Sequence, residues 1–190
     1  MTAKKNIREK ESILDVVTPS LVLMIICLIV TAALVSTYHV TKPIIAEALE
    51  KRSQEARQEV LPEGKGFKPM LTGEINPDQL TKGVSEVYQA DNNAGWVITS
   101  EDQGYGGTMK IITGFDTNGL ITNIKILEQS ETPGLGTKVG EDYFLEQFLG
   151  EDTVDEVEAI SGATISSEAM KRAVKWSLSQ MEEIRKEGTE

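Results

Sequence analysis

Three short segments of this chain combine glycine with hydroxyl or carboxyl side chains, the residue types that approach and hold a ligand. Residues 104–107 read Gly-Tyr-Gly-Gly, residues 131–136 read Glu-Thr-Pro-Gly-Leu-Gly, and residues 161–167 read Ser-Gly-Ala-Thr-Ile-Ser-Ser. Each lies between stretches whose patterning predicts a helix or a strand, in the kind of loop where binding sites usually occur. These segments are therefore the candidate site.

Segment 161–167 has the clearest chemistry. A predicted strand ends before it and a predicted helix begins within it, and the first turn of a helix offers free N–H groups and about half a positive charge, which together hold phosphate. Gly162 and Ala163 let a phosphate approach the backbone, and Thr164 adds a hydroxyl. Taken alone, these residues and Glu168 fit simple helix capping better than phosphate binding.

The other two segments are weak signals when each is taken alone. Gly134 and Gly136 permit positive φ and a close approach of the backbone to a flat ligand. Glycine turns such as 104–107 are common in β proteins, and a loop such as 131–136 can simply join a strand to a helix. Neither segment is a phosphate loop or a dinucleotide-binding fingerprint.

Composition excludes several classes of site. The 190 residues include 19 basic and 30 acidic side chains, a formal charge of −11, with Cys27 and His39 the only residues of their types. One cysteine cannot form an internal disulfide, and these two side chains cannot supply a zinc or iron–sulfur site. A pI near 4.7 argues against nucleic acid as a partner, because phosphate binding needs clustered Lys and Arg. We expect no metal.

The N-terminal region predicts a membrane span. Apart from His39, no acidic or basic residue lies between Asp15 and Lys42. As a helix, residues 16–38 would be about 35 Å long, against a hydrocarbon core of about 30 Å. A buried core helix and a cleaved signal peptide are the alternatives, but the apolar run is long for either. Four basic residues precede it, which predicts a cytoplasmic N-terminus: Lys4, Lys5, Arg8 and Lys10.

We expect four parts in the chain. Beyond residue 41 there remain 15 basic and 27 acidic residues, because four basic and three acidic ones precede it, so this part carries −12. Anionic lipid headgroups would repel it. The expected parts are a cytoplasmic N-terminus (1–15), a transmembrane signal anchor (16–41), a helical connector opened by Pro43 (42–62) and an extracytoplasmic domain (63–190).

The outer domain is predicted to be α+β, an antiparallel β-sheet with packed helices. Its strands show apolar and polar residues in alternation, and Asn118-Gly119 is a strong hairpin signal between two of them. A helix at 166–186 carries an apolar stripe. The expected strands are 84–88, 95–99, 108–115, 120–127 and 157–160, with a short helix at 143–149 and a loop or short strands at 63–82.

In combination, the three segments resemble the FMN-binding domain of the Rnf and Na⁺-pumping NADH:quinone reductase complexes. The resemblance rests on ETPGLG at 131–136, SGATISS at 161–167 and one preceding span, and it covers essentially the whole chain. In that family a flavin transferase joins FMN by a phosphoester to the last Thr or Ser of an S/T-G-A-T/S motif, which implies Thr164 here. The family's usual Asp before this motif is Glu158 in this chain.

The resemblance also implies the residues around the flavin. Tyr105, Thr132 and Leu135 are candidates for ring contacts, and Lys138 is either a charge near the reduced ring or a solvated lysine. No catalytic residue is expected, because the flavin does the redox chemistry. The complete expected set is Thr164 as the covalent site, with Ser161, Gly162, Ala163, Ser166, Glu131, Thr132, Gly134, Leu135, Gly136, Tyr105 and Lys138.

The implied function is that of a membrane-anchored electron-transfer subunit with covalent FMN, in an ion-translocating ferredoxin:NAD⁺ oxidoreductase (Rnf) complex. Its partners would be the other membrane subunits, the flavin transferase and lipid around the anchor. No independent turnover is expected, because no site for ferredoxin or NAD⁺ is visible. The short chain favours the G-type Rnf subunit.

Four alternatives remain open. They are the equivalent subunit of the NADH:quinone reductase, a freestanding surface flavoprotein, a non-redox anchored binding or sensor domain, and a hydrolase. The last is weakest, because Ser161 and Thr164 have no outer histidine as base, His39 being at the membrane end.

Overall fold

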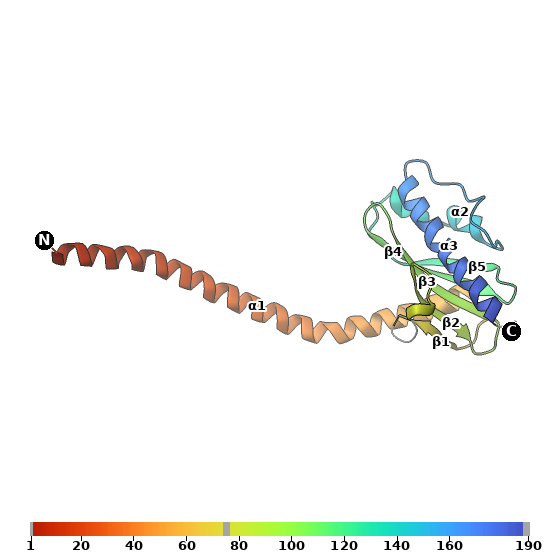
Figure 1. Ribbon diagram of the computed structural model, residues 1–190, viewed down its shortest axis with the longest axis horizontal. Coiled ribbons are helices and arrows are strands. Elements are labelled where there is room, and N and C mark those ends of the chain that lie inside the picture. The colour runs from red at the N-terminus through yellow and green to blue at the C-terminus, as the bar shows by residue number, and fades with distance from the viewer. Residues whose placement is uncertain (1, 74–76, 188–190) are drawn as a thin grey trace. The chain divides into compact units, whose positions relative to one another are not determined.

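The computed structural model describes residues 2–73 and 77–187, so residues 1, 74–76 and 188–190 of the predicted N-terminus and outer domain lie outside the described part. The chain forms two compact units, Met1–Glu50 and Lys51–Glu190. A single long helix, α1 (Thr2–Val60), provides all of the described residues of the first unit and continues into the second (Figure 1). Residues 42–60 of the predicted connector belong to this helix, and Pro43 lies inside it.

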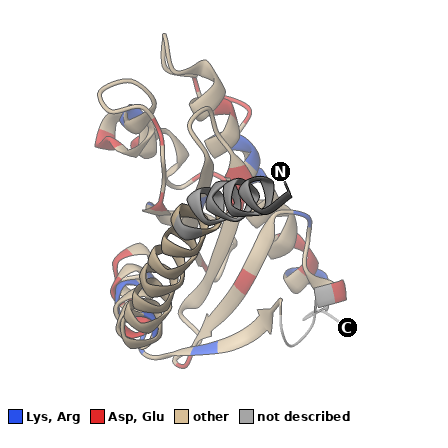
Figure 2. Cartoon of the chain, turned by 90° about the vertical axis from the view of Figure 1, so that its left-hand side faces the viewer, with Lys and Arg blue, Asp and Glu red and all other residues tan. Residues whose placement is uncertain are grey.

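The apolar stretch of α1 exposes its side chains along the first unit. Leu23, Leu28 and Leu34 are each more than half exposed. Figure 2 shows this stretch without charged residues. Among the described residues, α1 is the one helix that is long and apolar enough to cross a membrane, and this stretch is part of it. Length and composition therefore agree with the predicted span.

A five-stranded antiparallel sheet forms the centre of the second unit, with each strand paired to its neighbour in the sequence (Figure 1). The predicted antiparallel α+β class is thus confirmed. One strand, β1, lies within the stretch predicted as loop or short strands and is followed by a 3-10 turn, η1 (Pro77–Gln79). The strands are β1 (Phe67–Thr72), β2 (Val84–Ala90), β3 (Gly95–Gln103), β4 (Thr108–Asp116) and β5 (Ile121–Glu128).

Helix α3 (Thr164–Glu187) covers one face of the sheet, and its apolar stripe faces the strands. The stripe packs against side chains such as Ile98, Ile111 and Phe115 in the larger core. Ser177 Oγ donates to Ser100 Oγ over 3.0 Å, so a buried polar pair also links helix and sheet. All six predicted stripe residues are buried: Ala169, Ala173, Val174, Leu178, Met181 and Ile184.

The end of α1 covers the opposite face of the sheet. Ala56, Val60 and Leu61 are buried in a second core cluster with residues of β2, β3 and β4. The Thr122 hydroxyl donates to the Val60 carbonyl over 2.5 Å. The last residues of the predicted connector are therefore packed in the second unit, and helices lie on both faces of the sheet.

The chain between β5 and α3 is mostly irregular. It contains two 3-10 turns, η2 (Gly136–Gly140) and η3 (Glu146–Phe148), around a short helix, α2 (Asp142–Leu145). The strand predicted at 157–160 is wrong, because these residues pair with no neighbouring strand and two of their amides bond side chains. Glu158 N–H donates to Gln147 Oε1 over 2.8 Å, and Ile160 N–H donates to Ser167 Oγ over 3.0 Å.

Candidate functional site

The three segments selected from the sequence line one cavity of about 560 Å³ in the second unit. The turn between β3 and β4 contributes one side, the loop after β5 another, and the start of α3 the third. The lining residues are Tyr105, Glu131, Thr132, Leu135, Gly136, Gly162, Ala163, Thr164, Ile165 and Ser166.

The first turn of α3 forms one wall of the cavity and exposes a hydroxyl there. Ala163 N–H donates to the Ile160 carbonyl in the turn that precedes the helix, and Gly162 takes φ of +81°. The first backbone bond of α3 runs from Ser167 N–H to the Ala163 carbonyl, over 2.9 Å. The amides before Ser167 thus have no acceptor in the helix, and the exposed Thr164 lies at this end, where helices in general favour an anion.

A buried carboxylate connects the walls. Glu131 is only 5% exposed. Its Oε1 accepts a hydrogen bond from Gly106 N–H over 3.1 Å, and its Oε2 accepts one from Ser166 Oγ over 2.6 Å. One side chain therefore joins the glycine turn after β3, its own loop and the first turn of α3.

The glycines of the site leave room for this carboxylate. A Cβ added at Gly104 would lie 2.1 Å from Glu131 Oε1, and one at Gly136 would lie 2.4 Å from Oε2. Both distances are far below van der Waals contact. These glycines serve close packing, whereas Gly134 and Gly162 serve left-handed turns, with φ of +73° and +81°.

Apolar side chains surround the mouth of the cavity. Tyr105 is 70% exposed, Ile165 56% and Leu135 46%. Single exposed apolar residues are ordinary, but three that line the same cavity form an apolar surface suited to a flat ring.

Nine of the twelve expected site residues line the cavity, and three do not. Ser161 and Gly134 lie beside lining residues in the sequence, and Lys138 is half-buried in η2. Ile165 lines the cavity but was not expected there. It lies four residues before Ala169, so in the sequence it looks like the start of the buried stripe.

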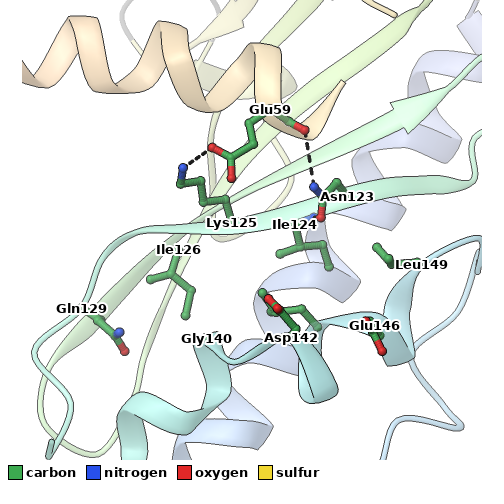
Figure 3. Close-up of a pocket in the computed structure, with 11 residues that line it drawn as sticks. Glu59, Asn123, Ile124, Lys125, Ile126, Gln129, Gly140, Asp142, Glu146 and Leu149 are labelled. Atoms are coloured by element: carbon green, nitrogen blue, oxygen red, sulfur yellow. Dashed lines mark hydrogen bonds and ion pairs between the residues drawn. The ribbon is translucent and has the colours of Figure 1, made fainter. Parts of the chain in front are cut away.

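A second cavity, of about 480 Å³, lies between the end of α1, strand β5 and the α2–η3 segment (Figure 3). Lys125 forms an ion pair with Glu59, and Asn123 Nδ2 donates to the Glu59 carbonyl over 3.4 Å. Asp142 and Glu146 add carboxylates to its wall. It contains none of the three selected segments.

Comparison with known proteins identifies the family. The chain matches the FMN-binding domain family over residues 104–179, a range that includes the whole lining of the first cavity. It is 31% identical to the G subunit of the Na⁺-translocating ferredoxin:NAD⁺ oxidoreductase complex of Acetobacterium woodii, and the match covers 87% of this chain and 91% of the relative. The chain belongs to this G-subunit family.

A second G subunit supports the assignment. The corresponding subunit of the ion-translocating oxidoreductase complex of Methanosarcina acetivorans is also 31% identical, with 83% of this chain and 90% of the relative covered. The fold resembles the crystal structure of NqrC from Shewanella oneidensis, with a TM-score of 0.50, 16% identity, and coverage of 70% of this chain and 94% of that one. The G-subunit family and the NqrC-like fold thus agree with the resemblance found in the sequence.

Proposed function

We propose that the chain is the flavin-carrying, membrane-anchored subunit of an ion-translocating ferredoxin:NAD⁺ oxidoreductase complex. The observation that carries the proposal is the cavity at the start of α3, which lies inside the FMN-binding domain match. The relatives are subunits of such complexes, so the partners would be the other membrane subunits.

The residues of the cavity fit the parts of FMN. Free amides at the start of α3 suit a phosphate, and Gly162 and Ala163 leave the backbone accessible. Leu135, Ile165 and Tyr105 provide apolar surface for the ring. When bound, FMN supplies one- and two-electron redox chemistry, for which the chain itself has no group.

We further propose a phosphoester between FMN and Thr164, because the other hydroxyls nearby are less suitable. Ser166 Oγ donates to Glu131, and Ser167 Oγ is buried and donates to the Ala163 carbonyl over 3.0 Å. Ser161 does not line the cavity. Thr132 does, but it lies in the loop rather than at the helix start. Thr164 alone among them combines exposure, a place in the lining and the anion-binding helix end.

The chain's residues would orient the flavin and limit its contact with water. The helix end would hold the phosphate, and the apolar wall would pack on the ring, which leaves its exposed edge available to a redox partner. The chain would not turn over ferredoxin or NAD⁺ alone. A flavin transferase would complete its maturation.

The decisive experiment is to test whether flavin survives denaturation on this hydroxyl. The full chain, co-expressed with a flavin transferase, should show a fluorescent band after denaturing electrophoresis and the mass of an FMN adduct on the Thr164 peptide. Thr164→Ala should reduce the fluorescence to background, and Thr164→Ser should retain it.

Thr132→Ala is the matched control, since it removes the other threonine hydroxyl in the cavity. Its covalent flavin should persist. Covalent flavin in Thr164→Ala, or an adduct on another residue, would contradict the attachment site. A wild-type chain that binds no flavin would contradict the function.

A further inference from the structure

The carboxylate of Glu131 is more deeply placed than any other ionisable group of the cavity lining. It is 5% exposed, whereas Tyr105 at the mouth is 70% exposed. Both of its oxygens accept hydrogen bonds, from Gly106 N–H and from Ser166 Oγ, and Ser166 lies two residues after Thr164. The side chain therefore holds the glycine turn and the helix start against each other.

The surrounding backbone is built around this group. Side chains at Gly104 or Gly136 would overlap the two carboxylate oxygens, and one at Gly106 would lie 2.1 Å from the Ser130 carbonyl. A buried carboxylate is costly unless its oxygens are hydrogen-bonded, and such charge-assisted bonds are strong.

We propose that Glu131 is a positioning residue of the flavin site and that its negative charge lowers the reduction potential of the bound flavin. This inference rests on the proposed function, in which FMN occupies the cavity that Glu131 lines. When the ring takes up two electrons and one proton, it gains one negative charge. A carboxylate in the wall opposes that gain, and its effect is strong because burial limits screening by water.

The test is a redox titration of the full chain in detergent, with dithionite as electron source, solvent as proton source and a reference dye. Glu131→Gln removes the charge and keeps the shape. Its amide oxygen can accept from Gly106, and its NH₂ can donate to Ser166 Oγ. We expect a higher flavin potential than in the wild type.

Glu131→Ala removes both the charge and the hydrogen bonds, so it tests positioning. We expect it to carry less covalent flavin than either the wild type or Glu131→Gln, which rescues the contacts. Glu128→Gln is the matched control. It makes the same chemical change at an exposed carboxylate near the end of β5, where solvent screens the charge, and its potential should equal that of the wild type.

A Glu131→Gln potential equal to or below the wild-type value overturns the electrostatic role. Wild-type flavin content in Glu131→Ala overturns the positioning role. Failure of the proposed function is distinguishable, because it would be seen in the wild type itself as an absence of flavin. Thermal unfolding of each variant identifies any that fails to fold.

Discussion

At the scale of single residues, the candidate site depends on the absence of side chains as much as on their presence. Gly104 and Gly136 both contact Glu131, and each would overlap a carboxylate oxygen if it carried a Cβ. Neither has a left-handed backbone, so the constraint is one of space. Flexible backbone is therefore not the reason for these two glycines.

This packing gives a prediction for Gly136→Ala. The added methyl group must displace Glu131 or Ser166, at a cost of about 1–3 kcal/mol in the free energy of unfolding. We expect reduced covalent flavin together with a lower midpoint in chemical unfolding. Gly73→Ala is the control, since no atom of the described residues lies within 4 Å of its Cβ and its φ is not positive. Equal flavin content in the two variants would count against the packing role.

At the scale of the elements, the turn between β4 and β5 is held by Asp116. Its Oδ1 accepts from the backbone N–H groups of Asn118 and Leu120 over 2.8 and 2.9 Å, and its Oδ2 accepts from the Asn118 amide over 3.1 Å. Partial burial acts to raise the pKa of Asp116, but these hydrogen bonds outweigh it and lower the pKa below its ordinary value. The ionised form is therefore the one that stabilises the turn.

The lowered pKa gives stability that depends on pH with a definite sign. A depressed carboxyl pKa contributes stability above the unfolded-state pKa, and this contribution is lost as the pH falls through the folded-state value. Asp116→Asn should therefore be less stable than the wild type at pH 7, by about 1 kcal/mol. The difference should shrink as the pH is lowered below about 4. Denaturant midpoints of both proteins at pH 7 and pH 3 measure it, and a constant difference would refute the assignment.

The end of α1 is an element that the sheet requires. Leu61 is 2% exposed in the second core cluster, so we expect Leu61→Ala to lower the free energy of unfolding by about 2–5 kcal/mol. Leu149→Ala is the control, because Leu149 is 38% exposed and should cost much less. Chemical unfolding of the full chain in detergent, followed by near-UV circular dichroism, compares them. Similar losses would mean that the second cluster adds little.

The elements also show where sequence patterning succeeds and fails. Apolar patterning and the Asn118-Gly119 turn identify β2 to β5, because these strands place apolar residues in the core, but β1 contains Pro69 and buries only Leu71. Residues 157–160 look like a short strand, yet the Glu158 and Ile160 amides donate to the side chains of Gln147 and Ser167. Such side-chain partners cannot be read from local periodicity.

The candidate site was largely predictable from its glycines and hydroxyls, since most of the expected residues line one cavity. The pairing of Glu131 with Ser166 was not predictable, because it joins residues 35 positions apart. Lys138, which the sequence leaves as either a charge near the ring or a solvated lysine, does not line the cavity. It lies in η2, of which only Gly136 is a lining residue. Only the three-dimensional arrangement shows that Glu131 and Ser166 line the cavity together and that Lys138 does not line it.

At the scale of the whole molecule, the testable property is topology. The basic N-terminus and the apolar stretch of α1 favour an outer flavin domain. In a Cys27→Ser background, Glu151→Cys should react in intact cells with a maleimide that does not cross membranes, because residue 151 is exposed. Lys4→Cys should react only after the cells are permeabilised. The reverse labelling pattern would show that the flavin domain lies on the cytoplasmic side, opposite to the proposed orientation.

The three walls of the cavity come from distant parts of the chain, and this sets the order of events during biosynthesis. Gly106 and Glu131 lie 25 positions apart, and Ser166, in the first turn of α3, follows Glu131 by 35 positions. A ribosome delivers that helix after the other two walls, so the hydroxyl and its surroundings exist together only once α3 has been synthesised. If a transferase recognises the assembled walls, truncated or misfolded chains stay unmodified. Under the proposed function, the fraction of chains that carry flavin would then report the fraction that had folded correctly.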